Sequence, residues 1–284
     1  MKINGLEFTI GADPEFFVCR KDGTPVSAHG LIKGDKKNPL KVKNGAVQVD
    51  GMALEFNIDP AFTQEQFLTN LDVVMETILG MVPGYSMYDK PVAEFGFEYI
   101  DAQPEEAKML GCDPDYNAYT GTANPRPSAA TPFRTASGHI HIGWTKDVNP
   151  LDPGHFEACC TLSKMLDVRL GIPSLTWDTD KKRRQLYGKA GCFRPKPYGM
   201  EYRTLSNAWL DPKRPYLRKM VFNETQKSIE KLFENNEAWN VSMSGLTAQE
   251  VINSEDAKKQ ELAVIQAIHY QKVCASVKEY REAA

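Results

Sequence analysis

Several features that would place a protein in a large class are missing from this sequence of 284 residues. No run of 18 apolar residues occurs, so no transmembrane helix is expected, and the first residues contain no apolar signal core. The chain also has no GxxxxGK[ST] loop and no GxGxxG turn. If a nucleotide binds, neither a P-loop nor a Rossmann turn holds it.

Excess positive charge and paired cysteine motifs are missing as well. The formal net charge of −3 argues against a nucleic-acid-binding protein, because such proteins are usually basic. The six cysteines show neither a CxxC pair nor a regular spacing, which is typical of reduced thiols in a cytosolic protein. These absences predict a cytoplasmic protein that binds neither nucleic acid nor a membrane.

The order of the expected elements indicates the fold class. Strand-like segments dominate the first two-thirds of the chain, and helix-like segments dominate the last third. This order favours an α+β fold with a mainly antiparallel sheet over alternating βαβ units. The expected strands cover 5–10, 15–19, 47–58 and 92–98, and the expected helices cover 156–170, 213–237, 247–253 and 255–282.

Two further segments have local signals of their own. Thr63 is expected to cap the start of a helix of roughly five turns, with Gln66 completing a capping box. Residues 111–135 are rich in Pro, Gly, Asn, Thr and Ser, which predicts a long irregular loop. Long loops in compact domains are often functional, so this segment is a candidate cover over a bound ligand.

Two of the five histidines stand in the stretch SGHIHIGW, residues 137–144. Side chains alternate along a strand, so His139 and His141 share one face, while Ile140 and Ile142 take the other. A lone strand histidine is more often structural than a ligand. Two on one face are a common way to present ring nitrogens to a metal or another ligand, so the pair favours a binding site.

Two stretches place acids inside apolar strands. In GADPEFF, Asp13 and Glu15 point to the same face, where two carboxylates repel each other unless a cation or water separates them. A metal site and a solvated sheet edge both remain open for this pair. In VDGMALEFNIDP, Glu55 lies in an apolar strand and should be paired or ligating. Asp50 is either a ligand or a residue of a hairpin turn.

The stretch from Arg183 to Arg203 is dense in arginine and glycine. Arginine forks match the geometry of phosphate and carboxylate groups. Glu201 and Arg203 share one face of an expected strand. A solvated basic face is the alternative, but glycine allows the backbone to approach a ligand, which favours anion binding.

Taken in order, these four motifs resemble the glutamine synthetase and glutamate–cysteine ligase group, and most closely its phage-type carboxylate–amine ligases. The resemblance covers residues 11 to about 210. It implies one catalytic domain over 1–284, with a helical part at 213–284, in the host cytoplasm if a phage encodes the chain. It also implies a curved, mostly antiparallel sheet on which acids and a histidine hold two or three Mg²⁺ or Mn²⁺ ions against ATP.

The resemblance further implies a role for each motif residue. Its metal ligands would fall into two groups, namely Glu15, Asp50 and Glu55 for one ion, and Asp13, His139 and Glu201 for the other. Its nucleotide and substrate contacts would be made by His141, Arg183, Arg184, Arg194 and Arg203. Of these, Arg194 and Arg203 would also be catalytic, because they would stabilise the transferring phosphoryl group.

The activity implied by the resemblance is ATP-dependent ligation of a carboxylate to an amine through an acyl phosphate. The partners would be ATP, an acid such as glutamate, and an amine on an amino acid, peptide or protein. A guanidino-kinase-type phosphotransferase on the same sheet is an alternative, and only the ligase requires an amine. A non-catalytic phage or virion binding protein is a second alternative. The clustered acids argue against it, because an inactive copy has no reason to keep them.

Overall fold

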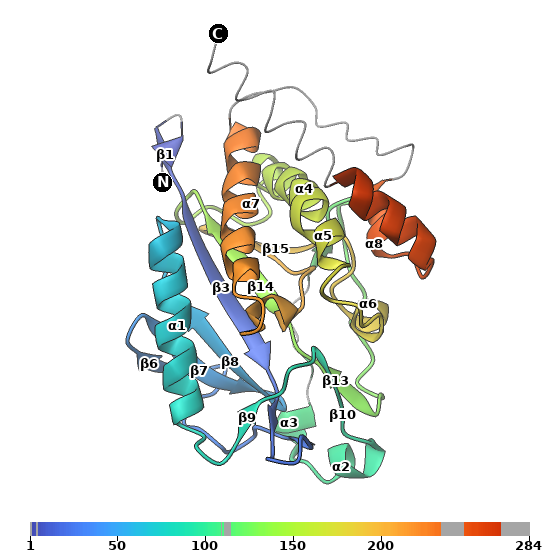
Figure 1. Cartoon of the computed structure of the whole chain (residues 1–284). Coiled ribbons are helices and arrows are strands. Elements are labelled where there is room, and N and C mark those ends of the chain that lie inside the picture. The colour runs from blue at the N-terminus through green and yellow to red at the C-terminus, as the bar shows by residue number, and fades with distance from the viewer. Residues whose placement is uncertain (1, 4, 109, 111–114, 234–246, 268–284) are drawn as a thin grey trace.

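The computed structural model describes residues 2–3, 5–108, 110, 115–233 and 247–267 (Figure 1). The predicted loop at 111–135 and the predicted helices at 213–237 and 255–282 therefore lie partly outside the described residues. Within the described ranges, no helix combines the length and the apolar character needed to cross a bilayer. The cysteines described are all free.

A nine-stranded sheet is the largest element of the structure, and all of its strand pairs are antiparallel. Together with the packed helices, this sheet confirms the predicted α+β class. In spatial order the strands are β12 (Thr122–Ala123), β11 (Tyr116–Asn117), β15 (Cys192–Lys196), β16 (Gly199–Tyr202), β14 (Gly138–Gly143), β3 (Thr9–Phe16), β8 (Ala53–Ile58), β7 (Gly45–Asp50) and β6 (Leu40–Val42).

Smaller strand groups lie beside the main sheet. They are β1 (Lys2–Ile3) with β2 (Leu6–Glu7), β10 (Val92–Glu94) with β13 (Phe133–Thr135), and β4 (Val18–Cys19) with β5 (Pro25–Val26) and β9 (Ser86–Met87).

Two sequence predictions are corrected by these short strands. The strand expected over 92–98 ends at Glu94, and residues 97–101 are helical. The segment expected to be irregular contains β11, β12 and β13. Distant partners form these strands, since Tyr116 pairs with Phe193 and Ala93 with Arg134. Local composition could not reveal such pairings.

Helices occur at the predicted places, with bounds that differ by a few residues where both ends are described, and short helices occur between them. They are α1 (Gln64–Gly80), α2 (Phe97–Asp101), α3 (Glu105–Lys108), α4 (Pro153–Leu166), the π-helix η1 (Asp167–Gly171), α5 (Ile172–Ser174), α6 (Lys182–Leu186), the 3-10 helix η2 (Asn207–Leu210), α7 (Tyr216–Phe233), α8 (Ala248–Ile252) and a helix over 257–267. The helix predicted at 156–170 is thus α4 continued by the π-helix.

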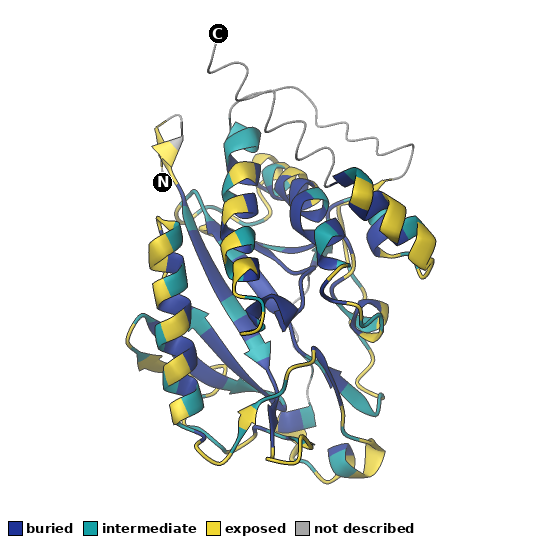
Figure 2. Ribbon diagram, viewed as in Figure 1, coloured by how far each residue is buried: buried dark blue, intermediate teal, exposed yellow. Residues whose placement is uncertain are grey.

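The two faces of the sheet differ because side chains alternate along each strand. One face carries apolar residues such as Ile10, Phe56 and Ile140, all fully buried. Helices α1, α4 and α7 pack on this face, and Figure 2 shows the outer sides of α1 and α7 exposed while their inner sides are buried. The opposite face carries the polar and charged residues of the sequence motifs, so packing of the core fixes which way those residues point.

The start of α1 agrees with the capping signal. The Thr63 hydroxyl accepts a hydrogen bond from the backbone N–H of Gln66 at 3.2 Å. The Gln66 side chain accepts from Phe62 N–H at 3.0 Å, one residue earlier than a capping box requires. Phe67 follows directly and is fully buried in the core, so the cap sets where the helix enters the core.

We expect Thr63→Ala to destabilise the protein by about 1 kcal/mol, because the first-turn N–H groups of α1 lose their acceptor. Thr69→Ala is the matched control, since Thr69 is exposed within the same helix and alanine is the better helix former. Urea denaturation of both variants checks this. Equal midpoints for Thr63→Ala and wild type would show that the cap contributes nothing.

Candidate active site

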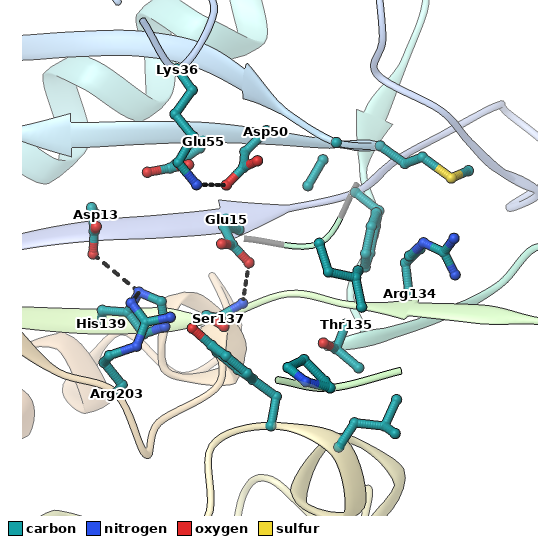
Figure 3. Close-up of a pocket in the computed structure, with 18 of the residues that line it drawn as sticks. Asp13, Glu15, Lys36, Asp50, Glu55, Arg134, Thr135, Ser137, His139 and Arg203 are labelled. Carbon is teal, nitrogen blue, oxygen red and sulfur yellow. Dashed lines mark hydrogen bonds and ion pairs between the residues drawn. The ribbon is translucent and has the colours of Figure 1, made fainter. Parts of the chain in front are cut away.

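The acids and histidines of the sequence motifs converge on the polar face of the sheet, across five neighbouring strands. Glu15 of β3 faces Glu55 of β8 in the strand register, and Asp13 faces His139 of β14. On the other side of β14, His141 faces Glu201 of β16. Figure 3 shows Asp13 and Glu15 on one strand with Glu55 and His139 on its two neighbours. Residues separated by up to 188 positions therefore form one continuous row.

The first cluster consists of Glu15, Asp50 and Glu55, whose ligand oxygens all lie within 4.8 Å of one another. Asp50 stands at the end of β7, where Gly51 with φ 59° begins the hairpin to β8, so the turn interpretation of Asp50 is correct. The same position brings its carboxylate to the cluster. Lys36 reaches Asp50 at 3.2 Å from the solvent side, where 54% of its side chain is exposed.

Crowding of these carboxylates is visible in their pKa values. Burial, followed by the charge of Asp50, raises the pKa of Glu15 to about 7, although Ser137 N–H donates to its Oε2 at 2.8 Å. Burial and the charges of Asp13 and Glu15 raise the pKa of Glu55 well above its usual value. The lone half-exposed lysine does not offset three carboxylates. A divalent cation would, because it favours the charged form of each ligand.

The second cluster contains Asp13, His141 and Glu201, whose ligand atoms also lie within 4.8 Å of one another. His139 borders the same space, with Nδ1 3.4 Å from Asp13 Oδ1 and 3.3 Å from Glu201 Oε1. His141 Nε2 lies 3.0 Å from Asp13 Oδ1, and its Nδ1 contacts the Tyr198 hydroxyl. The assignment of His139 to the metal and His141 to phosphate stays a prediction, because the geometry offers both imidazoles.

Three buried atoms of this cluster make no well-aligned hydrogen bond to the described residues: His139 Nε2, and the pair Asp13 Oδ1 and His141 Nε2, which contact each other at 3.0 Å. A buried polar atom without a partner is costly, so their convergence indicates a bound group. Carboxylate oxygens suit Mg²⁺ and Mn²⁺, and imidazole nitrogen is an accepted ligand for transition metals. The residues of both clusters therefore fit divalent cations, with the histidine-containing cluster better matched to Mn²⁺.

The two histidines differ in their expected charge. Burial and the neighbouring Arg203 lower the pKa of His139 to about 4, so this imidazole is neutral at physiological pH. Burial opposes protonation of His141, but the charge of Asp13 raises its pKa. The same two histidines hold the pKa of Asp13 well below its usual value against the effect of burial. Only a neutral imidazole can ligate a metal, which favours the ring of His139.

Glu201 joins the acidic row to a group of cations. Its carboxylate accepts from Arg194 at 3.0 Å, lies 3.1 Å from Lys196 Nζ, and contacts Arg203. The Arg203 guanidinium also lies 3.3 Å from Asp115 and 4.9 Å from the ring centre of Tyr187.

This arrangement provides anion-binding donors next to the second cluster. The structure thus brings together nine of the residues predicted from the sequence. They are Asp13, Glu15, Asp50, Glu55, His139, His141, Arg194, Glu201 and Arg203.

Arg183 and Arg184 lie elsewhere. Arg183 is fully buried and donates to the backbone oxygens of Thr204, Arg203 and Leu205, at 2.7–3.2 Å. Arg184 pairs with Asp178 at 3.1 Å. Both guanidinium groups are used in contacts within the protein, so the ligand contacts expected of them stay predictions without support from their positions.

Two glycines of the same stretch lie against protein atoms, so the prediction that they admit a ligand has no support from their positions. A side chain at Gly188, which has φ +71°, would collide with the Arg183 guanidinium, and one at Gly199 would collide with the backbone oxygen of Ile142. These glycines are needed for close packing inside the protein.

Four contact residues were missed by the sequence reasoning. Lys196 had a usable signal, because it stands two residues after Arg194 on the same strand face. Lys36, Asp115 and Tyr187 had none, since each comes from a loop that the fold alone brings to the sheet.

Two cavities open on the polar face. The smaller one, of about 240 Å³, contains Glu15, Asp50 and Arg203 in its walls. The larger one, of about 780 Å³, lies over the other half of the strands and is lined by Thr9, His141 and Trp144 among others. Asp13 and Glu55 line both cavities. The acidic row is therefore the place where two separate ligands would meet.

A buried network behind the sheet holds β16 in place. Asp167 Oδ1 accepts from the Tyr202 hydroxyl at 2.7 Å and from Thr204 at 3.2 Å, and its Oδ2 accepts from Tyr119 at 2.9 Å. Burial raises the pKa of Asp167 to about 7 despite these bonds. Because Tyr202 and Thr204 flank Arg203 on the opposite face, this network positions Glu201 and Arg203.

Comparison with known proteins agrees with the resemblance noted from the sequence. Residues 129–241 match the family described as phage phiEco32-like COOH.NH2 ligase-type 2. The match confirms the resemblance over this stretch, which includes His139, Glu201 and Arg203, and it supports a ligase enzyme. No curated protein matches the chain by sequence.

Three solved structures are similar to the chain at a distance. "Apo GmaS without ligand" has 12% identity and a TM-score of 0.40, with 98% of this chain and 70% of that chain covered. A bifunctional glutathione synthetase from Pasteurella multocida has 12% identity and a TM-score of 0.41, with coverages of 93% and 47%. A GmaS/ADP complex has 10% identity and a TM-score of 0.39, with coverages of 98% and 70%. These likenesses are too distant to support an argument about function.

The raised pKa of Glu15 gives a pH-dependent prediction for the metal-free protein. Between pH 4.5 and about 7 the folded state binds more protons than the unfolded state, so stability falls as pH rises through this window. Glu15→Gln should therefore melt above wild type at about pH 8 in EDTA, and the difference should vanish near pH 4.5. Thermal scans at both pH values measure it, with exposed Glu76→Gln of α1 as control. A lower melting temperature for Glu15→Gln at high pH would refute the crowding argument.

Proposed function

We propose that the chain is an ATP-dependent carboxylate–amine ligase that works through an acyl phosphate. The observation that carries this proposal is the position of Glu201, which contacts the histidine-containing cluster and three cationic side chains at once. Side chains that can ligate a metal thus lie next to side chains that can donate hydrogen bonds to phosphate. This arrangement suits phosphoryl transfer, where charge spreads over the transferred group. The family match over 129–241 supports the same reaction class.

The two cavities suggest where the substrates would sit. The residues lining the larger cavity include Gly11, Gly143 and Trp144, and an aromatic side chain beside glycines suits a flat base. The smaller cavity would take the acid and the amine. The γ-phosphate would then lie at the acidic row shared by both, next to His141.

The chain's own residues would act in two steps. A carboxylate oxygen of the acid attacks the γ-phosphorus and ADP leaves, while Arg194 and Arg203 donate to the oxygens that gain charge. The amine nitrogen then attacks the acyl carbon, the bond to phosphate breaks, and the leaving phosphate accepts the proton that the nitrogen gives up. Two or three Mg²⁺ or Mn²⁺ ions would be held by the acids and histidines of the two clusters and would neutralise phosphate charge there.

A phosphotransferase of the guanidino-kinase type remains the alternative. It would use the same cations and the same acidic row, but it would transfer the phosphoryl group to nitrogen and stop. The two reactions differ in the fate of the carboxylate oxygen, which only the ligase passes to phosphate.

An oxygen-transfer experiment separates the two. An ADP-release screen over pairs of acids and amines first identifies an acid that supports turnover, and the reaction is then run with that acid carrying ¹⁸O in its carboxylate. We expect the label in released phosphate and amide only when amine is present. Unlabelled phosphate, or a stable phosphorylated nitrogen product, would contradict the ligase.

Arg203→Lys should lower the ligase rate by about a hundredfold or more, because a point charge replaces a guanidinium fork that holds both Glu201 and the transferring group. Arg214→Lys is the matched control, since Arg214 pairs with Asp211 in a turn outside both cavities. Steady-state kinetics with melting curves checks both. Wild-type turnover in a folded Arg203→Lys variant would remove this residue from the reaction.

A further inference from the structure

Arg134 of β13 is a buried cation in the wall of the smaller cavity, and only 5% of it is exposed. Five described arginines are buried to this degree, and three of them pair with carboxylates: Arg169, Arg184 and Arg203. Arg183 has no carboxylate partner but donates to three backbone oxygens and a hydroxyl. Arg134 differs from these four because it lines a cavity and has neither a carboxylate partner among the described residues nor the several backbone acceptors that Arg183 has.

The hydrogen bonds of Arg134 involve a single nitrogen. Its Nη1 donates to the backbone oxygens of Thr131 and Phe133 at 3.0 and 2.9 Å. Its Nε is buried and has no partner in the described part of the chain. Burial lowers the pKa of Arg134, and no neighbouring carboxylate raises it. Arginine stays protonated even so, which leaves a buried positive charge facing only neutral acceptors.

The position of Arg134 separates it from the reacting centre. Figure 3 shows its side chain apart from Asp13, Glu55 and Arg203. Apolar side chains, including Phe17 and Met52, also line this cavity. A ligand that fills it would meet the acids and Arg203, apolar side chains, and the guanidinium of Arg134 apart from them.

We propose that Arg134 binds a carboxylate of a substrate, namely one that does not take part in the reaction. This inference rests on the proposed function, since it assigns the far end of the same cavity. A carboxylate matches the guanidinium through Nη2, because the hydrogen bonds of Arg134 to the described residues are all made by Nη1, and a charge-assisted pairing of this kind adds orientation as well as affinity. The carboxylate can belong to the acid substrate, as in a dicarboxylic acid, or to the amine substrate, as in an amino acid.

The test measures binding, so it does not require turnover. In the presence of Mn²⁺ and ADP, calorimetry compares succinate, glutarate and adipate with butyrate, valerate and hexanoate, in which a methyl group replaces one carboxylate. A second arm compares β-alanine and γ-aminobutyrate with propylamine and butylamine. We expect at least a tenfold preference for the extra carboxylate in one arm, and that arm names the substrate that carries it.

Arg134→Gln should abolish the preference while Mn²⁺ binding persists. Arg126→Gln is the matched control, because Arg126 is exposed on the same segment and should leave the preference unchanged. If Arg134→Gln does not fold, Arg134→Lys decides, since it keeps the charge but loses the fork and should reduce the preference. No preference in either arm for wild type, or a wild-type preference in a folded Arg134 variant, would overturn the proposal.

The two proposals fail separately. Suppose that Arg134 is required for tighter binding of ligands with an extra carboxylate, but no acid and amine give an amide. The carboxylate site would then stand, and the ligase proposal would be wrong. Amide formation from an acid or amine that carries an extra carboxylate, with the same KM in Arg134→Gln as in wild type, would keep the ligase and remove the carboxylate site.

Discussion

Repulsion among carboxylates on one face of the sheet is the constraint on which the rest of the site depends. Antiparallel pairing puts Glu15 opposite Glu55 and brings Asp13 beside two histidines, and burial then removes the water that would screen these charges. The apolar face of the same strands, packed under α1, α4 and α7, contributes most of their hydrophobic burial. The polar face costs free energy unless cations reach it, which is the arrangement expected of a functional site.

Within the described part of the chain, most of the cations lie at one end of this row. Glu201 has Arg194, Lys196 and Arg203 around it, whereas the cluster at Glu15 and Asp50 has an ion pair with the half-exposed Lys36. The two ends are thus suited to different partners. At the Glu201 end the arginines can bind an anion, whereas the carboxylates at the Glu15 end need an added cation. The Asp167 network behind β16 keeps the first end rigid through Tyr202 and Thr204.

The sequence predicted most of the site because strand alternation needs no knowledge of the fold. It placed Asp13 with Glu15, and His139 with His141, on common faces. It could not predict the register between strands, nor the loops that bring Lys36 and Asp115 to the sheet. Composition alone is a weak guide at Arg183. An arginine near glycines predicts a ligand contact, yet Arg183 donates to backbone oxygens of the protein. The strand expected over 92–98 failed similarly, since its partner β13 is only three residues long.

Titration of Mn²⁺ into the protein in the presence of ATP tests whether the carboxylates of the polar face bind cations, because it counts the ions bound. We expect at least two ions for each chain, with one lost in Glu15→Gln and a different one lost in Glu201→Gln. Since the two clusters use separate ligands, the double variant should lose both. A wild-type protein that binds no Mn²⁺ with nucleotide present would contradict the account.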